Sequence, residues 1–302
     1  MRVSTSMVFQ QLTDKLSENS QGMSVLQGQL STGLKYSLPS EAPDLVGRVQ
    51  AFESRLKTLD ADVKAVSKVR VGVDAQAAAL EVAAEITDRL KALAFQGANS
   101  ATSQSVLNAY AEEVASMRRS LLDLANTKDA SERYVFGGVR SGESPYRQNP
   151  DGTTEYMGSG TPFRVRVSDN SYEDVSVPGP NIWKGVPRTG GTIDMFAALT
   201  ELEHAYRSGD MPKRVEGLAD VNSIVNNIGI AIAKTGGIQQ RLEMTERQAQ
   251  ETSIRAQQAL SELRDLDFPL ALAQLKKQEL LMEATQSMLG RLSQLSLLDS
   301  LR

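Results

Sequence analysis

The feature that most constrains this fold is an apolar pattern that keeps helical spacing for about fifty residues. The pattern advances by three or four residues at a time through Val49, Phe52, Leu56, Leu59, Val63 and Val66, and then through Val73, Ala77, Leu80 and Ala84. An α-helix of roughly 50 residues is about 75 Å long. Because ordinary globular domains use much shorter helices, the pattern predicts a helical rod.

A second stripe lies near the N-terminus. Its apolar residues follow a heptad in which Asn19 fills the one polar position, and they are Phe9, Leu12, Leu16, Met23, Leu26 and Leu30. An Asn in such a seam commonly fixes the register of helix pairing. Gly33 and the Pro-containing segment 39–43 end this helix, and Asp44 is placed to cap the next one.

A third helix has the same spacing and is predicted to return antiparallel to the rod. Its apolar positions are Leu107, Tyr110, Val114, Met117, Leu121 and Leu124, and the short polar segment 97–103 precedes them.

The character of the chain changes between residues 137 and 192. Gly and Pro become frequent, residues 149–152 form a turn signal, and short alternating stretches occur at 153–156, 163–167 and 175–177. This segment predicts a small β-rich insertion.

Helical spacing resumes near Asp194 and runs to Gly236 and Gly237, where the pattern predicts a helix end. It then continues with small seam residues from Ile238 to Leu266, until Pro269 breaks it. Beyond Pro269 lies an amphipathic tail, with Leu275, Met282 and Leu289 on one row, Leu281, Met288 and Leu295 on the next, and Leu272 and Leu292 beside them.

The expected fold is therefore mainly α: a long antiparallel helical rod or coiled-coil bundle formed by the N- and C-terminal halves, with a small β-rich inserted domain. The expected divisions are 1–38 and 268–302 as terminal assembly helices, 39–136 and 193–267 as the two halves of the rod, and 137–192 as the insert.

The two terminal segments each have an apolar face too rich for an isolated helix in water. We expect an assembly interface made of Phe9, Leu12, Leu16, Met23, Leu26 and Leu30, with Leu272, Leu275, Met282, Leu289, Leu292 and Leu295. We also expect both ends to be poorly ordered in the monomer and helical after assembly. The alternative is that they close one intramolecular bundle.

Catalytic chemistry finds little support in the residues present. The chain has no Cys, and its one histidine, His204, is predicted to lie on a helix surface. The Gly pairs at 137–138, 190–191 and 236–237 lack the Lys-Ser/Thr ending of a phosphate loop and are predicted to be turns or helix ends. Asp169 and Asp174 flank a turn without EF-hand spacing. We expect no catalytic residues, cofactor or metal.

Charge and hydropathy limit the partners. The net charge is −4 with no basic block, so nucleic acid is not an expected partner. No apolar run reaches the length of a membrane span, and the N-terminus lacks the apolar stretch of a secretory signal. These features predict a cytosolic protein unless a specialised machine exports the chain unprocessed.

Several short motifs resemble bacterial flagellins and their relatives. They are Met1-Arg2-Val3-Ser4-Thr5, Leu30-Ser31-Thr32-Gly33 before a Pro-containing loop, and Leu124-Ala125-Asn126-Thr127 running into Arg133-Tyr134-Val135-Phe136-Gly137-Gly138. The last of these, and the ending at residues 295–301, resemble the hook–filament junction members of that family. The insert at 138–192 has no counterpart among these motifs, and its short length suits a junction member.

The resemblance implies a structural role in the flagellum. It implies self-assembly into a ring of identical subunits, with an adjacent hook-associated protein on the hook side and flagellin on the filament side. It also implies a cytoplasmic export chaperone at the C-terminal helix and extracellular export through the flagellar type III apparatus without a cleaved signal. A short flagellin that forms the filament itself is the alternative, and a cytoplasmic helical binding or signalling module is a third interpretation.

Overall fold

The computed structural model describes residues 2–36, 40, 42–149, 152–168, 171–188 and 191–300; side-chain exposure is described for these residues except 2–6, 167, 168, 171 and 292–300. The chain forms two compact units. Unit 1 comprises Met1–Thr58 and Thr252–Arg302, and unit 2 comprises Leu59–Glu251. The mainly α fold expected from the sequence, with a small strand-containing insert, is confirmed.

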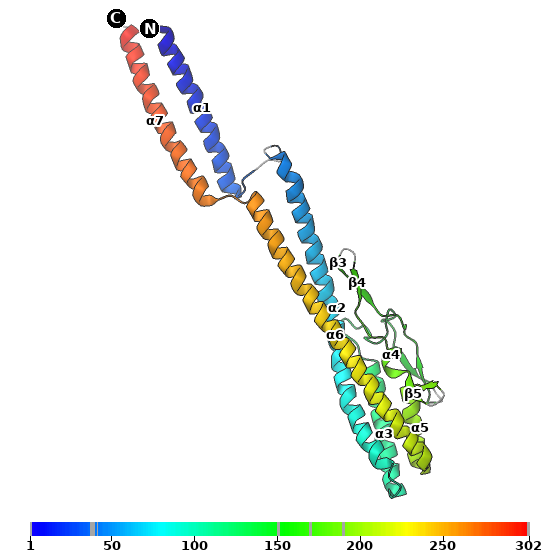
Figure 1. Cartoon of the computed structure of the whole chain (residues 1–302). Coiled ribbons are helices and arrows are strands. Elements are labelled where there is room, and N and C mark those ends of the chain that lie inside the picture. Colours follow the sequence, from blue (N-terminus) through cyan, green and yellow to red (C-terminus); the bar gives the residue numbers. More distant parts are fainter. Residues whose placement is uncertain are drawn as a thin grey trace. The chain divides into compact units, whose positions relative to one another are not determined.

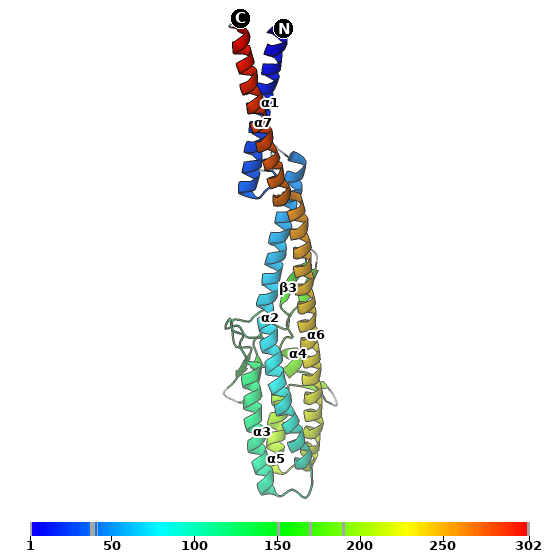
Figure 2. The ribbon, with the colours of Figure 1, turned by 90° about the vertical axis from the view of Figure 1, so that its left-hand side faces the viewer.

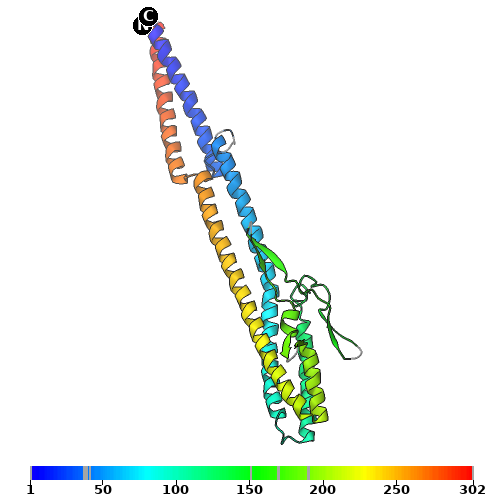
Figure 3. The ribbon, with the colours of Figure 1, turned by 45° about the vertical axis from the view of Figure 1, so that its right-hand side comes forward.

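Unit 1 is built from helices at the two ends of the chain. α1 (Arg2–Thr32) lies beside α7 (Phe268–Ser300), as Figures 1 and 3 show. The beginning of α2 (Pro43–Gly97) and the end of α6 (Met211–Arg264) complete the unit. Asp44 lies in the first turn of α2 and not before it, so the expected cap residue is inside the helix.

Unit 2 holds the longest helical stretches. The remaining parts of α2 and α6 run with α3 (Gln104–Ala125) and α5 (Met195–Ser208), as Figure 2 shows. Asp194 caps α5, because its Oδ1 accepts a hydrogen bond of 2.9 Å from the backbone N–H of Phe196. Gly209, at φ 71°, ends the same helix in the left-handed conformation.

The insert consists of three two-stranded antiparallel hairpins and one short helix among the described residues. β1 (Tyr146–Gln148) pairs with β2 (Thr154–Tyr156), β3 (Arg164–Ser168) with β4 (Ser171–Asp174), and β5 (Val186–Arg188) with β6 (Gly191–Ile193). The short helix α4 (Pro180–Trp183) lies between the second and third hairpins.

Two local expectations were wrong. Gly236 and Gly237 lie inside α6, which continues unbroken to Arg264. A glycine costs a helix only about 1 kcal/mol, and burial of Thr235, Ile238 and Leu242 around the pair favours continuation. The stretch 175–177 is not a strand; the strand ends at Asp174, and Val175 and Val177 instead bury their side chains in the core.

A break between helices occurs near Pro269, but the first helix ends several residues before the proline, and Pro269 belongs to the next helix. α6 ends at Arg264, residues 265–267 connect, and Pro269 occupies the first turn of α7. A proline is tolerated there because the first backbone N–H groups of a helix have no intrahelical partner.

The core of unit 2 combines a helical seam with an aromatic cluster from the insert. Trp183 is fully buried, with its ring centroid 5.6 Å from that of Phe136 and 6.2 Å from that of Phe196. Tyr146 extends the cluster at 5.5 Å from Phe196. Trp183 therefore packs inside the protein.

Gln76 of α2 fastens the insert to the helices. Its side-chain amide is almost fully buried and donates to the carbonyl oxygens of Val135 and Val177 at 3.1 and 2.8 Å. Its Oε1 accepts from the backbone N–H of Val177 at 3.1 Å. One side chain thus satisfies three backbone groups from two separate parts of the chain.

Candidate assembly surface

The α1–α7 pair contains all twelve residues that the heptad patterns single out. In α1, Leu26 is buried, Leu12, Leu16, Met23 and Leu30 are partly buried, and Phe9 is 49% exposed. In α7, Leu275, Met282 and Leu289 are partly buried, whereas Leu272 is 52% exposed. Leu292 and Leu295 lie in α7, but their side chains are outside the described residues. Pairing therefore covers one row on each helix.

The pairing of α1 with α7 is the intramolecular alternative that the sequence left open. The partly buried positions of α7 are spaced at three and four residues through Leu275, Gln278, Met282, Thr285 and Leu289. Asn19 is partly buried in the matching row of α1. Disorder of the ends before assembly stays a prediction about the free chain.

One polar position interrupts the seam. Gln278 approaches Gly22 of α1 so closely that a Cβ at Gly22 would lie 2.5 Å from its Nε2. The Oε1 of Gln278 is buried and accepts no hydrogen bond within the described part of the chain. Because an unsatisfied buried amide opposes packing, this layer weakens the α1–α7 pair.

The base of the pair is fixed by a short crossover, formed by residues 33–35 and 264–266. The backbone N–H of Lys35 donates to the Arg264 carbonyl, and that of Leu266 donates to the Gly33 carbonyl, both at 2.8 Å. Gly33 has φ 72°, and the ring of Phe268 passes 3.6 Å from the place where a Cβ would be. These contacts hold the end of α1 against the start of α7.

Side chains reinforce the crossover. Lys35 Nζ donates to the Glu262 carbonyl at 2.5 Å, and Gln29 Nε2 donates to the Lys35 carbonyl at 2.6 Å. A hydrogen bond from Ser261 lowers the pKa of the Asp265 carboxyl below its ordinary value, and the Arg264 guanidinium adds to the effect. Burial is greatest near this crossover, at Leu26, Ala256, Leu260 and Ala271.

Apolar side chains outside the covered row remain exposed on both helices, and on α7 Leu270, Leu281 and Met288 share one face as a second, uncovered row. The exposed large apolar side chains of α7 and its start are Phe268, Leu270, Leu272, Leu280, Leu281 and Met288, and those of α1 are Met7, Val8, Phe9 and Val25. Leu280 is 66% exposed. Exposed apolar side chains in this number on one pair of helices are typical of an interaction surface.

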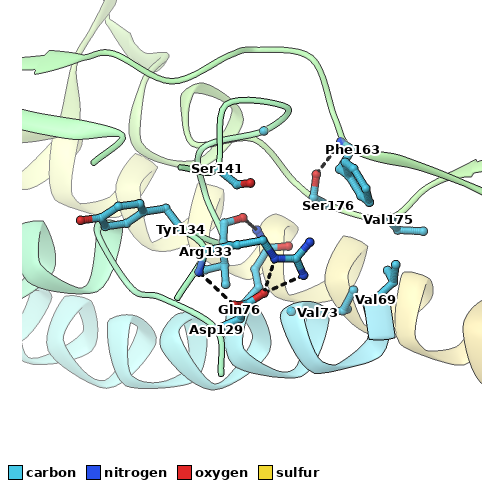
Figure 4. Close-up of a pocket in the computed structure, with 13 residues that line it drawn as sticks. Val69, Val73, Gln76, Asp129, Arg133, Tyr134, Ser141, Phe163, Val175 and Ser176 are labelled. Atoms are coloured by element: carbon cyan, nitrogen blue, oxygen red, sulfur yellow. Dashed lines mark hydrogen bonds and ion pairs between the residues drawn. The ribbon is translucent and has the colours of Figure 1, made fainter. Parts of the chain in front are cut away.

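Unit 2 contains a small recess between α2 and the insert, shown in Figure 4. Its volume is about 60 Å³, and Val69, Val73, Phe163 and Val175 form its apolar walls. Its charged groups are Asp129 and Arg133. The space is too small for a typical organic ligand.

The carboxylate in this recess is fully engaged. Asp129 Oδ1 accepts from the backbone N–H groups of Ser131 and Arg133 at 2.7 and 3.0 Å, and Oδ2 accepts from the Arg133 guanidinium at 2.8 and 3.1 Å. Burial raises the pKa of Asp129, but these hydrogen bonds outweigh it and hold the pKa below its ordinary value. Asp129 and Arg133 therefore stabilise the conformation of the loop at residues 129–133.

The remaining candidates for chemistry lie apart from one another. His204 is exposed on α5, and Asp174 forms an ion pair of 2.8 Å with Arg164. Asp169 lies outside the described residues. Glu112 pairs with Arg207 of α5 at 2.8 Å, and Glu113 pairs with Arg89 of α2 at 2.8 Å. In the part of the chain with described positions, no group of His, Asp and Glu has the geometry of a metal site.

Among the residues described, no helix combines sufficient length and apolar content to cross a bilayer.

Comparisons with known proteins identify both terminal regions. The bacterial flagellin N-terminal helical region matches residues 3–141, and the bacterial flagellin C-terminal helical region matches residues 218–301. Flagellin from Listeria monocytogenes is 20% identical over 298 residues, which cover 97% of this chain and 96% of that protein. Flagellar hook-associated protein 3 from Escherichia coli K12 is 22% identical over 320 residues, covering 98% of each.

Solved structures share the fold at low sequence identity. Flagellar hook-associated protein 3 from Legionella pneumophila superposes with a TM-score of 0.65 at 14% identity, covering 71% of this chain and 98% of that one. A flagellar hook-associated protein described as putative, from Vibrio parahaemolyticus, gives a TM-score of 0.66 at 14% identity, with 74% and 100% covered. Since the two flagellin regions together span most of the residues, the chain belongs to the bacterial flagellin family.

Proposed function

We propose that this structural component of the bacterial flagellum forms the junction ring between hook and filament by self-assembly through its terminal helices. The observation that carries the proposal is the uncovered apolar row on the α1–α7 pair, represented by Leu270, Leu281 and Met288 of α7. Burying such a row against neighbouring subunits removes apolar surface from water and so lowers the free energy of the assembly. The proposed role is structural and contains no catalytic step.

The fold of related structures supports a junction role over a filament role. The solved chains from Legionella pneumophila and Vibrio parahaemolyticus that share the fold are hook-associated proteins. In the proposed assembly, segments 1–38 and 268–302 form the inner core. Segments 39–136 and 193–267 form the surrounding rod layer, and 137–192 forms the outer domain.

The partners follow from the same proposal. A ring of identical subunits contacts an adjacent hook-associated protein on one side and flagellin on the other. A cytoplasmic chaperone covers the C-terminal helix before the chain is exported to the outside without a cleaved signal. The apolar row of α7 gives that chaperone a surface to shield.

Immunogold electron microscopy tests the location. An antibody against residues 140–190, applied to intact flagella, is expected to label one cluster where hook meets filament. Gold along the whole filament would instead identify a filament subunit, and gold confined to the cell body would refute a flagellar location.

Incorporation tests the role of the terminal helices. Leu281→Asp with Met288→Asp places two charges in the uncovered row of α7, and we expect loss of incorporation while the buried Trp183 of unit 2 keeps its native emission. Gln286→Asp, on the exposed polar face of α7, is the control and should incorporate normally. Normal filament attachment with the double variant would contradict the proposal.

A further inference from the structure

Asp62 is an unusual residue for the face of α2 that it occupies. Its exposed fraction is 8%, and it follows the seam spacing between Leu59 and Val66, which are 5% and 1% exposed. A carboxylate at a buried seam position opposes helix packing unless a cation accompanies it. The helical pattern of α2 alone supplies no reason for an acid at this position.

The cation comes from the insert. Arg166 of β3 places its Nη2 3.2 Å from Asp62 Oδ1, although the two residues are 104 positions apart in the chain. The other strand of the same hairpin reaches α6, where Glu173 Oε2 lies 2.8 Å from Arg241 Nε. The β3–β4 hairpin is therefore ion-paired to both long helices of unit 2.

The position of the hairpin explains why these contacts matter. Figures 1 and 2 show β3 and β4 beside a part of α2 that α3 and α5 do not reach. Val165 of β3 also packs against the apolar core. The hairpin thus supplies a third packing element where the bundle of unit 2 narrows to α2 and α6.

We infer that docking of the β3–β4 hairpin and packing of α2 against α6 are coupled through the Asp62–Arg166 ion pair. When the hairpin leaves, the Asp62 carboxylate stays in the seam without this cation, and the adjoining part of α2 loosens. When the hairpin docks, the Arg166 guanidinium compensates the charge of the Asp62 carboxylate, and α2 packs closely against α6. The insert is thereby a conditional support of the rod, a role independent of where the protein sits in the flagellum.

The ion pair also makes this support sensitive to salt. The Arg166 side chain is 45% exposed, so dissolved ions reach it and screen the attraction. High salt should therefore loosen the 59–68 stretch of α2 more than the stretch of α2 that packs against α3.

Hydrogen exchange of the full-length chain tests the coupling. Arg166→Gln should raise exchange in residues 59–68 and 241–251 by about tenfold, with little change in α3 or α5. Arg164→Gln is the matched control, because it breaks the Arg164–Asp174 pair inside the hairpin and leaves the ion pairs to α2 and α6 in place.

A rescue variant separates coupling from general damage. Adding Asp62→Asn to Arg166→Gln removes the uncompensated charge and should return exchange in 59–68 to within about twofold of the parent chain. Unchanged exchange in Arg166→Gln would overturn the inference. So would equal loosening in Arg164→Gln, or failure of Asp62→Asn to rescue. None of these outcomes bears on the immunogold location of the protein.

Discussion

Replacing Gln76 by Leu should detach the insert from the helices of unit 2, because it removes three hydrogen bonds without changing side-chain size much. The lost bonds leave the carbonyls of Val135 and Val177 and the N–H of Val177 without their partner. An unsatisfied buried polar group costs about 1–3 kcal/mol. Since the adjoining recess of about 60 Å³ can admit water, we take the lower end and expect a total of about 3 kcal/mol.

The assay is urea unfolding followed by tryptophan emission. Trp183 is the only tryptophan and is fully buried in the aromatic cluster of the insert, so its emission reports directly on docking. With a slope of about 2 kcal/mol per molar urea, the expected loss lowers the midpoint by about 1.5 M.

Gln104→Leu provides the matched control. Gln104 Nε2 also makes three hydrogen bonds, to Asn108, Tyr206 and Arg207, but its side chain is exposed and water replaces it. We expect a loss below about 1 kcal/mol there. Equal midpoint shifts for Gln76→Leu and Gln104→Leu would refute the argument that burial makes Gln76 the main polar anchor.

Three further changes have definite expected outcomes. Gly72→Ala should raise the melting temperature, because a Cβ there meets Asp129 at an ordinary 3.6 Å and the helix gains about 0.5–1 kcal/mol; a lower melting temperature would show that the recess cannot accept a methyl group. Gly97→Ala should destabilise unit 2 by about 1–3 kcal/mol in urea unfolding, because its Cβ would lie 2.5 Å from the buried Tyr206 ring; an unchanged midpoint would contradict this packing. Because the folded-state pKa of Asp129 lies below its ordinary value of 3.8, its stabilisation is present above about pH 4 and lost as pH falls through the folded pKa. Asp129→Asn should therefore lose less stability than the parent chain between pH 5 and pH 2 in paired urea titrations, and equal losses would exclude this carboxylate as a source of acid sensitivity.

The helices were predictable because their signal is local. The steps of three and four residues along α2 and α3, and the heptad of α1, are visible without any partner, since helical spacing alone places those residues on one face. The same reasoning failed at Gly236 and Gly237, where the cost of two glycines is smaller than the gain from packing α6 as one helix.

For the candidate assembly surface, the sequence indicated a set of apolar residues and not which of them pair. The sequence of α7 presents apolar residues on two neighbouring rows, and both suit a helix partner equally well. Pairing with α1 partly covers Leu275, Met282 and Leu289 and leaves Leu281 and Met288 exposed. The division of the tail into a covered row and a free row is a consequence of tertiary contact.

The seam of α2 shows most clearly what the sequence determined and what the tertiary structure decided. The apolar spacing predicted that Val63 and Ala77 lie in the seam, but both are only partly buried. The buried face of α2 instead includes three polar residues, Asp62, Gln76 and Thr87, between its apolar ones. Sequence determined that α2 is a long helix with one buried face, because periodicity belongs to a single segment. Whether that face could hold Asp62 and Gln76 was decided by Arg166, Val135 and Val177, which lie about 60 to 100 residues away and satisfy these two side chains only in the folded chain.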